Sequence, residues 1–74
     1  MDFVIFGKDT CPYTQRALGK LKADQSAYTY IRVANVYEIK QEPYAGIIAE
    51  QGHTTLPVIF DIRFIGGCDN FLRQ

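Results

Sequence analysis

The chain has 74 residues, of which 47% are hydrophobic and 14% aromatic, and its eight basic residues balance its eight acidic ones. This length suits one domain, residues 1–74, whose core is near the lower size limit for folding without disulfides or metals. A formal net charge of zero and the lack of any basic run argue against nucleic acid and anionic membranes as partners.

The hydrophobic runs and the cysteine count indicate the compartment and argue against a membrane protein or a disulfide-rich one. No apolar run approaches the ~18 residues that a membrane-spanning helix needs, and the amino terminus lacks a basic region followed by an apolar stretch, so we expect a cytoplasmic protein. Two cysteines, Cys11 and Cys68, are too few for a disulfide framework. The one histidine, His53, is expected in an exposed loop, and no metal site is predicted within the chain.

The first half of the chain predicts a strand, a helix and a second strand. Residues 3–6 are continuously apolar, which is typical of a buried strand, and residues 28–33 alternate and are rich in strand formers. Between them, residues 12–24 predict an amphipathic helix, in which Gly19 indicates close packing because glycine costs up to ~1 kcal/mol there. The apolar face of this helix carries Tyr13, Ala17, Leu18 and Leu21. A helical connection makes the two strands a parallel, right-handed β-α-β unit.

Residues 36–51 give weaker signals, from which we predict a second helix. Pro43 suits its first turn, and Gly52 suits its end. The apolar side chains that share one face of this helix are Tyr44, Ile47 and Ile48.

The last third predicts a hairpin and a short helix. Residues 58–60 and 63–65 are short apolar segments, close enough to require an antiparallel pair. Residues 69–74 leave room for barely two helical turns. The predicted order is therefore β-α-β-α-β-β-α, with no repeats, linkers or low-complexity segments.

Cys11 is the candidate nucleophile. It follows the loop of residues 7–10 and precedes Pro12, which fits the first helical position, so Cys11 should be the N-cap residue. The helix N-terminus and the nearby charge of Lys8 both favour the thiolate, and we expect the pKa of Cys11 to fall below ~8.5. The alternative is an inert, buried cysteine, but such a residue gains nothing from this setting.

Two further segments carry weaker signals. Pro57 in Thr55-Leu56-Pro57 stands at a strand entry, where it either lacks a ladder donor or forms a cis peptide bond. The segment Gly66-Gly67-Cys68-Asp69 reads as a plain turn into a helix or as a place where a ligand approaches the backbone and a helix N-terminus.

Three segments in matching order and spacing resemble the signature motifs of the glutaredoxin family. They are Lys8-Asp9-Thr10-Cys11-Pro12-Tyr13, Thr55-Leu56-Pro57 and Ile65-Gly66-Gly67-Cys68-Asp69, and the resemblance covers nearly the whole chain. It implies an α/β, thioredoxin-like fold with a four-stranded mixed sheet in the order 2-1-3-4, flanked by three helices. It also implies that Pro57 is a cis-proline facing the nucleophile.

The resemblance also assigns the site residues. Cys11 is the nucleophile, Thr14 lies in the first turn of its helix, and Lys8 and Tyr13 border the site. The glutathione-binding residues that it implies are Lys8, Cys11, Tyr13, Thr55, Leu56, Pro57, Gly67, Cys68 and Asp69. Among them, the backbone of Leu56 pairs with the cysteinyl part of glutathione, and Cys68 and Asp69 hold its γ-glutamyl group.

The chain departs from the family pattern in a few places. Thr14 stands where many glutaredoxins have a second cysteine, so the active site is of the monothiol type, and Cys68 is a poor substitute. The position that usually meets the glycine carboxylate of glutathione is nearest Tyr44, with Lys40 or Gln41 as alternatives. The hairpin and the last helix are also shorter than is usual in the family, which implies a less stable fold than that of longer members.

The resemblance implies a glutathione-disulfide oxidoreductase in cell redox homeostasis and electron transport, with glutathione as co-substrate. We expect a monomer that reduces glutathionylated proteins or low-molecular-weight disulfides through Cys11. One alternative is a homodimer that binds or transfers a [2Fe–2S] cluster through Cys11 and glutathione, which the Cys-Pro-Tyr-Thr sequence disfavours. Another is an electron donor to a protein disulfide of the ribonucleotide reductase type, which Thr14 disfavours.

Overall fold

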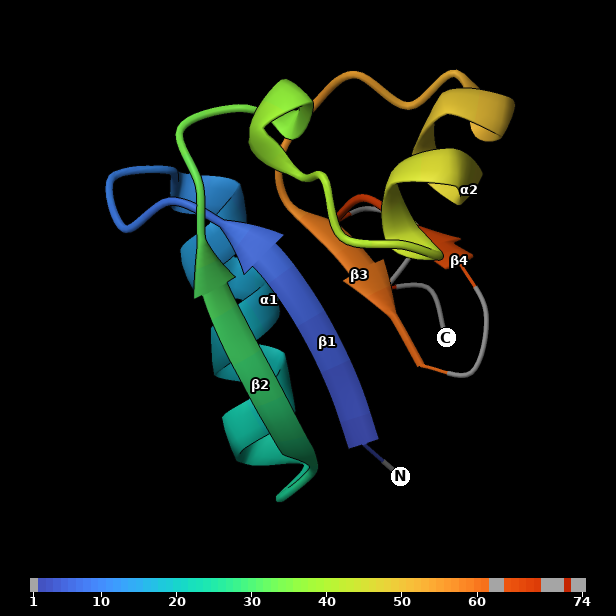
Figure 1. Cartoon of the computed structure of the whole chain (residues 1–74). Coiled ribbons are helices and arrows are strands. Elements are labelled where there is room, and N and C mark those ends of the chain that lie inside the picture. Colours follow the sequence, from blue (N-terminus) through green and yellow to red (C-terminus); the bar gives the residue numbers. More distant parts are fainter. Residues whose placement is uncertain (1, 62–63, 69–71, 73–74) are drawn as a thin grey trace.

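The computed structural model describes residues 2–61, 64–68 and 72. These residues form one mixed sheet with helices on its faces (Figure 1). In chain order the elements are β1 Asp2–Gly7, α1 Pro12–Ala23, β2 Ala27–Arg32, the 3-10 helix η1 Val36–Glu38, α2 Tyr44–Gln51, β3 Val58–Phe60 and β4 Phe64–Gly66. No helix in this part of the chain combines the length and apolar character that crossing a bilayer requires.

The strands lie in the order β2-β1-β3-β4. β1 runs parallel to β2 along its whole length and antiparallel to β3, and β3 runs antiparallel to β4. The α/β class, the mixed sheet with flanking helices and the parallel β1-α1-β2 connection are thus confirmed. β4 begins one residue later than predicted; residues 62–63 of the hairpin and most of the expected last helix over 69–74 lie outside the described part of the chain.

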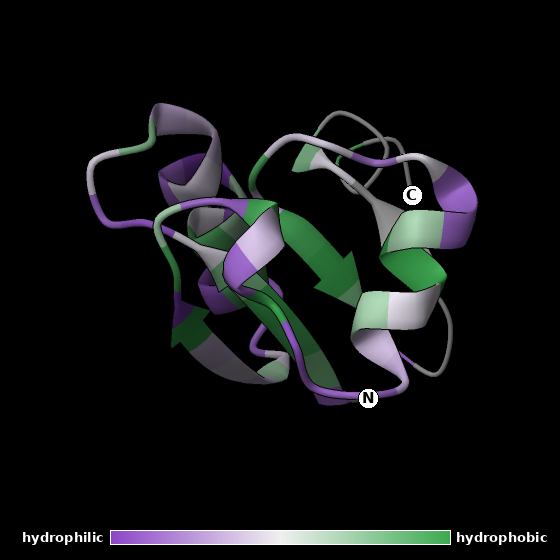
Figure 2. Cartoon of the chain, turned by 45° about the horizontal axis from the view of Figure 1, so that its top comes forward, coloured by the Kyte–Doolittle hydropathy of each residue, from purple (hydrophilic) through white to green (hydrophobic). Residues whose placement is uncertain are grey.

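Two apolar clusters hold the helices on opposite faces of the sheet. Successive residues of β1 point to opposite sides, so Ile5 packs toward α1 while Phe6 packs toward η1 and α2. Figure 1 shows α1 behind the sheet and α2 in front of it. In Figure 2, the central strand β3 is green along its whole length, because it is covered on both faces.

The buried face of α1 differs from the prediction at one position. Thr14 is buried and Tyr13 is 51% exposed, although Tyr13 was expected on the apolar face. The buried positions 14, 17, 18 and 21 keep the helical spacing, and moving the face by one residue places a hydroxyl in the core. The expected close packing at Gly19 is wrong, because Gly19 is exposed and a Cβ there would meet nothing within 4 Å.

The segment before α2 contains two features that the sequence did not indicate. Residues 36–38 form η1, which the Asn35 side chain caps by accepting a hydrogen bond from the backbone N–H of Tyr37 at 3.0 Å. Pro43, expected in the first turn of the helix, is instead its N-cap and follows a cis peptide bond. The end of α2 is as predicted, since Gly52 adopts the left-handed conformation at φ 64°.

Candidate active site

Cys11 is the N-cap residue of α1, with Pro12 at the first helical position, as predicted. Its backbone N–H donates to the carbonyl of Lys8 at 3.1 Å, which closes a turn over residues 8–11. Its carbonyl accepts from the N–H of Gln15 at 3.1 Å, the first hydrogen bond of the helix. The thiol is therefore presented between a closed turn and a helix start, and it is partly exposed.

The pKa of the Cys11 thiol is lowered from its ordinary value of 9.0. Partial burial of the sulfur raises the pKa, but the backbone N–H and the hydroxyl of Thr14, the backbone N–H of Tyr13 and the charge of Lys8 together lower it by more. The helix start that Pro12 pre-sets supplies the two N–H groups. The backbone N–H groups at the helix start thus lower the pKa of Cys11 more than the charge of Lys8 does.

Thr14 is fully buried beneath the turn. No described residue makes a well-formed hydrogen bond with its Oγ1, although the hydroxyl lies near enough to the Cys11 sulfur to lower the pKa of the thiol. A Cβ built on Gly7 would come within 2.6 Å of both Oγ1 and Cγ2 of Thr14. Gly7, which was expected in a loop but ends β1, thus allows the helix to sit directly on the strand.

The register of the sheet brings the three motif segments to one end. Phe6 pairs with Val58, so Gly7, which precedes the Cys11 loop, lies beside Pro57 at the start of β3. Gly67 follows at the end of β4, where a Cβ would lie 3.7 Å from the carbonyl oxygen of Pro57. The peptide bond between Leu56 and Pro57 is cis, as the resemblance implied.

The remaining predicted glutathione-binding residues differ in exposure. Thr55 is exposed, Leu56 is half-buried and packs against the cluster of Phe6, and Cys68 is buried at 5% exposure. Cys11 and Cys68 are not joined by a disulfide. Asp69 lies outside the described residues. Among the residues that the structure describes, no group of three or more metal-ligating side chains is found.

Tyr44, one of the three residues predicted for the glycine carboxylate of glutathione, is half-buried. Its ring lies 5.3 Å from that of Phe6 and 4.8 Å from that of Phe60, within the apolar cluster between α2 and the sheet. Lys40 and Gln41 are exposed. The exposure of Lys40 and Gln41 therefore favours these two over Tyr44 for that contact, which stays a prediction.

His53 is half-buried, which corrects the expectation of an exposed loop residue. Its Nε2 lies 3.5 Å from Oγ1 of Thr55, and a Cβ built on Gly67 would lie 3.4 Å from its Cε1. The imidazole thus fills the space between two of the motif segments. Nothing in the local sequence indicated this contact, because it joins loops that are distant along the chain.

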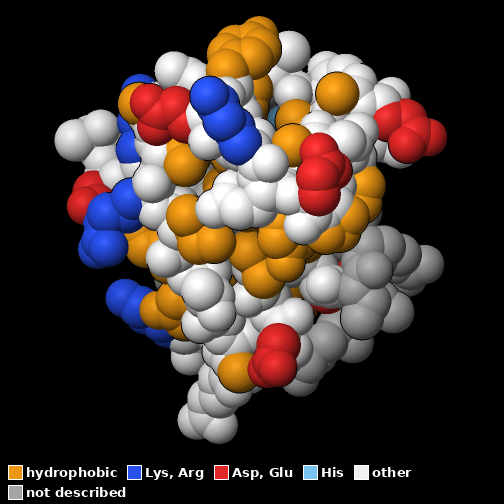
Figure 3. All heavy atoms as spheres, in the orientation of Figure 1, with side chains coloured by type: hydrophobic (Ala, Val, Ile, Leu, Met, Phe, Trp, Pro, Cys, Tyr) orange, Lys and Arg blue, Asp and Glu red, His pale blue; other side chains and the backbone are white. Residues whose placement is uncertain are grey.

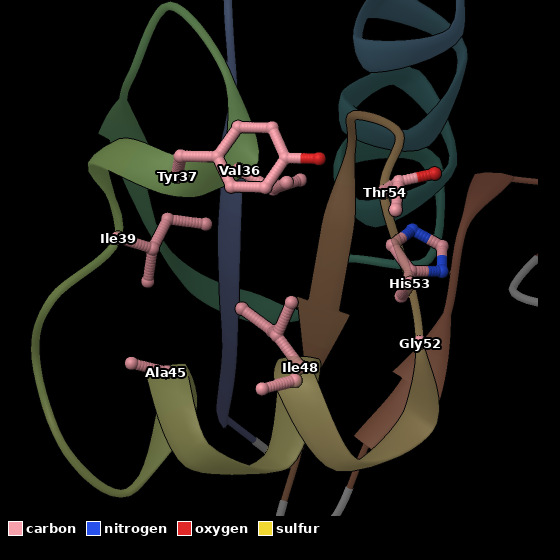
Figure 4. Close-up of a pocket in the computed structure, with 9 residues that line it drawn as sticks. Val36, Tyr37, Ile39, Ala45, Ile48, Gly52, His53 and Thr54 are labelled. Carbon is pink, nitrogen blue, oxygen red and sulfur yellow. The ribbon is translucent and has the colours of Figure 1, made fainter.

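A cavity of about 320 Å³ opens between η1, α2 and the segment that precedes Thr55. In Figure 4, the Tyr37 ring reaches across its mouth with the hydroxyl directed toward Thr54, and Ile48 rises from α2 below. The full lining is Val36, Tyr37, Ile39, Ala45, Ile48, Ala49, Gly52, His53 and Thr54. It contains none of the predicted catalytic residues and adjoins the site only at His53 and Thr54.

Sequence reasoning missed a polar cluster beside the Cys11 turn. The Asp9 carboxylate accepts a hydrogen bond from Tyr30 Oη at 2.8 Å, and Arg32 Nε lies 3.0 Å from each of its oxygens. Strand alternation was the available signal, since it puts Tyr30 and Arg32 on one face of β2, but only the fold brings Asp9 there. In Figure 3, basic side chains gather along the edge where Figure 1 shows β2 and this loop.

Comparison with known proteins gives a consistent result. A family model described as glutaredoxin matches residues 3–65. Glutaredoxin 3 of Escherichia coli (strain K12) is 34% identical over 67 residues, which cover 89% of this chain and 76% of that protein.

Solved structures are similar over most of the chain. Reduced Escherichia coli glutaredoxin has a TM-score of 0.68 at 32% identity, covering 99% of this chain and 91% of that one. The dithiolic glutaredoxin 2-C-Grx1 of Trypanosoma brucei brucei has 0.68 at 35% identity, covering 92% and 70%. Glutaredoxin from Brucella melitensis has 0.69 at 27% identity, covering 99% and 76%. The chain therefore belongs to the glutaredoxin family.

Proposed function

We propose that this glutaredoxin reduces mixed disulfides of glutathione by a monothiol mechanism with Cys11 as the nucleophile. The observation that carries the proposal is the setting of Cys11, a partly exposed thiol at a helix N-terminus with a lowered pKa. The residue one helical turn later is Thr14, and the second thiol, Cys68, is buried. One reactive thiol is sufficient when glutathione itself completes the cycle.

The first half of the cycle transfers glutathione to the protein. The Cys11 thiolate attacks the glutathione sulfur of a glutathionylated protein or small molecule, and a new sulfur–sulfur bond forms as the old one breaks. The substrate sulfur leaves as a thiolate and takes a proton from solvent. Because both the lowered pKa of Cys11 and the exposure of its sulfur favour attack, the protein needs no separate general base.

The second half regenerates Cys11 with free glutathione. A second glutathione thiolate attacks the glutathione sulfur of the mixed disulfide, releases Cys11 as the thiolate and leaves as glutathione disulfide. Over the full cycle, one mixed disulfide and one free glutathione become one substrate thiol and one glutathione disulfide. The proton that the attacking glutathione gives up to solvent matches the proton that the substrate thiolate takes up, and the protein is unchanged. A compartment rich in reduced glutathione, such as the cytoplasm, sustains this cycle.

Glutathione binding is assigned to the end of the sheet where the three motif segments meet. The backbone of Leu56 pairs with the cysteinyl part, while Lys8 and Tyr13 flank it. Cys68 and Asp69 hold the γ-glutamyl group, and Lys40 or Gln41 meets the glycine carboxylate. The close approach of Gly67 to the carbonyl of Pro57 supports a common groove for these contacts.

A reduction assay with a glutathionylated peptide tests the proposal. Cys11→Ser should abolish glutathione-dependent release of the peptide thiol, because it removes the nucleophile. The matched variant Cys68→Ser removes the other thiol of the chain and should retain most of the activity. Comparable losses from the two variants would refute the monothiol scheme.

A further inference from the structure

Asp9 occupies the corner of the turn that presents Cys11. The N–H of Cys11 donates to the carbonyl of Lys8 across this turn, so Asp9 is its second residue. The Asp9 carboxylate is held from β2 by Tyr30 at 2.8 Å and by Arg32 at 3.0 Å. The Asp9 carbonyl is held from α1, because Nε2 of Gln15 donates to it at 2.8 Å.

This arrangement ties the turn to the rigid part of the fold. Tyr30 packs against the apolar cluster between α1 and the sheet, and the Arg32 guanidinium lies 5.0 Å from the centre of the Tyr30 ring. Burial and the Asp9 carboxylate raise the pKa of Tyr30 to about 12, so its hydroxyl remains a donor throughout the physiological range. Tyr30 and Arg32 in turn lower the pKa of Asp9, which keeps that carboxylate charged.

Stability alone does not explain the cluster. The side chains of Arg32 and Asp9 are 69% and 58% exposed, and ion pairs with this exposure contribute little to folding. A carboxylate two residues before a thiolate would also oppose ionisation of the thiol if it were free to turn toward the sulfur. The contacts with Tyr30 and Arg32 direct it toward β2 and compensate its charge.

We propose that Asp9, held by Tyr30 and Arg32, is a positioning residue that fixes the turn so that the Lys8 ammonium faces the Cys11 sulfur. Of the charged groups on this side of the fold, Lys8 lowers the pKa of the Cys11 thiol, whereas Asp9 pairs with Arg32 and Tyr30 of β2, and the Tyr30 phenol also interacts with the Cys11 thiol. This inference rests on the proposed function for its kinetic consequence. Its structural consequence, the effect of Lys8 on the pKa of Cys11, does not depend on glutathione.

The pH dependence of Cys11 alkylation by iodoacetamide tests the positioning directly. Lys8→Gln should raise the pKa of Cys11 in the wild-type background, and the same change should have a clearly smaller effect in Asp9→Ala. Asp24→Ala is the matched control, because Asp24 also forms an exposed ion pair, with Lys20 at 2.9 Å, at the far end of α1. In that background the effect of Lys8→Gln should be unchanged.

Turnover of a glutathionylated peptide gives the second readout. Asp9→Ala should lower kcat/KM roughly tenfold, as expected for a misplaced reacting group, while Asp24→Ala stays within about twofold. Tyr30→Phe, which keeps the ring packing and removes one hydrogen bond, should give a smaller loss in the same direction. Its unfolding temperature, with that of Asp9→Ala, shows whether the fold is intact.

The two readouts separate the possible failures. If Lys8→Gln has the same effect in Asp9→Ala as in the wild type, or if Asp9→Ala merely lowers the pKa of Cys11, Asp9 acts through its charge only and the proposal is wrong. If the coupling between Lys8 and Asp9 is present but no variant turns over glutathionylated peptide, the proposed function is wrong while the positioning role holds.

Discussion

At the scale of single residues, the chemistry depends on how Cys11 is surrounded. Burial of the sulfur opposes ionisation, whereas two backbone N–H groups, the Thr14 hydroxyl and Lys8 favour it, and the second set prevails. Backbone donors at a helix start cannot be removed by substituting their side chains. The reactivity of Cys11 is therefore built mainly into the position of the helix.

The first prediction concerns pH. Alkylation of Cys11 should rise with pH through a midpoint below 9.0, the ordinary cysteine value, and Cys68→Ser isolates this thiol for the measurement. Since the folded pKa is depressed, ionisation of Cys11 stabilises the fold fully above the unfolded pKa. That contribution is lost as pH falls through the folded pKa. A midpoint at or above that of the urea-unfolded protein would contradict the lowered pKa.

Thr14→Val distinguishes the effect of the Thr14 hydroxyl on Cys11 from the packing of the Thr14 side chain against Gly7. The isosteric change keeps the contact with Gly7 and removes the hydroxyl, so the pKa of Cys11 should rise modestly. Because the buried Oγ1 has no well-formed hydrogen bond to any described residue, unfolding free energy should not decrease and should increase by up to about 1–3 kcal/mol. Chemical denaturation and thiol titration on one sample measure both. A lower pKa, or a loss of stability, would show that the hydroxyl has another partner.

Thr14→Cys should convert the site to the dithiol type. Positions 11 and 14 lie one helical turn apart, within reach of a disulfide, and the buried side chain at position 14 already interacts with the Cys11 thiol. The variant should form an internal disulfide on oxidation and gain reduction of protein disulfides. Peptide mapping after oxidation identifies the bond, and absence of both effects would show that the start of α1 is held differently.

At the scale of elements, the contact between β1 and α1 positions the candidate active site. Gly7→Ala would force a Cβ to within 2.6 Å of Thr14, so we expect a loss of about 1–3 kcal/mol in unfolding free energy and a raised pKa of Cys11. Gly19→Ala is the control on the same helix, and because that position is open it should stabilise the protein by up to about 1 kcal/mol. Equal effects of the two changes on stability would contradict this account.

Elements with a regular pattern were predictable from sequence. The apolar run of β1, the spacing of α1 with Pro12 at its start, and Gly52 at the end of α2 each have a local physical cause. The missed features depend on contacts between distant residues. Thr14 rather than Tyr13 is buried because Gly7 of β1 leaves room above it.

At the scale of the whole molecule, one sheet with two apolar faces places the site at a single end. The helix start at Cys11 and the strand entry at Pro57 could be predicted from motif and spacing, since each has a cause in the local sequence. The contacts of Asp9 with Tyr30 and Arg32, and the place of His53 beside Gly67, could not, because each requires the strand order.

The mass of the intact protein after the first half of the cycle tests the central claim most directly. The reduced protein is mixed with an equimolar glutathionylated peptide in the absence of free glutathione. The account predicts one glutathione on Cys11, located by peptide mapping, with an equal amount of free peptide thiol, and full reversal when glutathione is added. Attachment of the peptide in place of glutathione, or modification at Cys68, would contradict it.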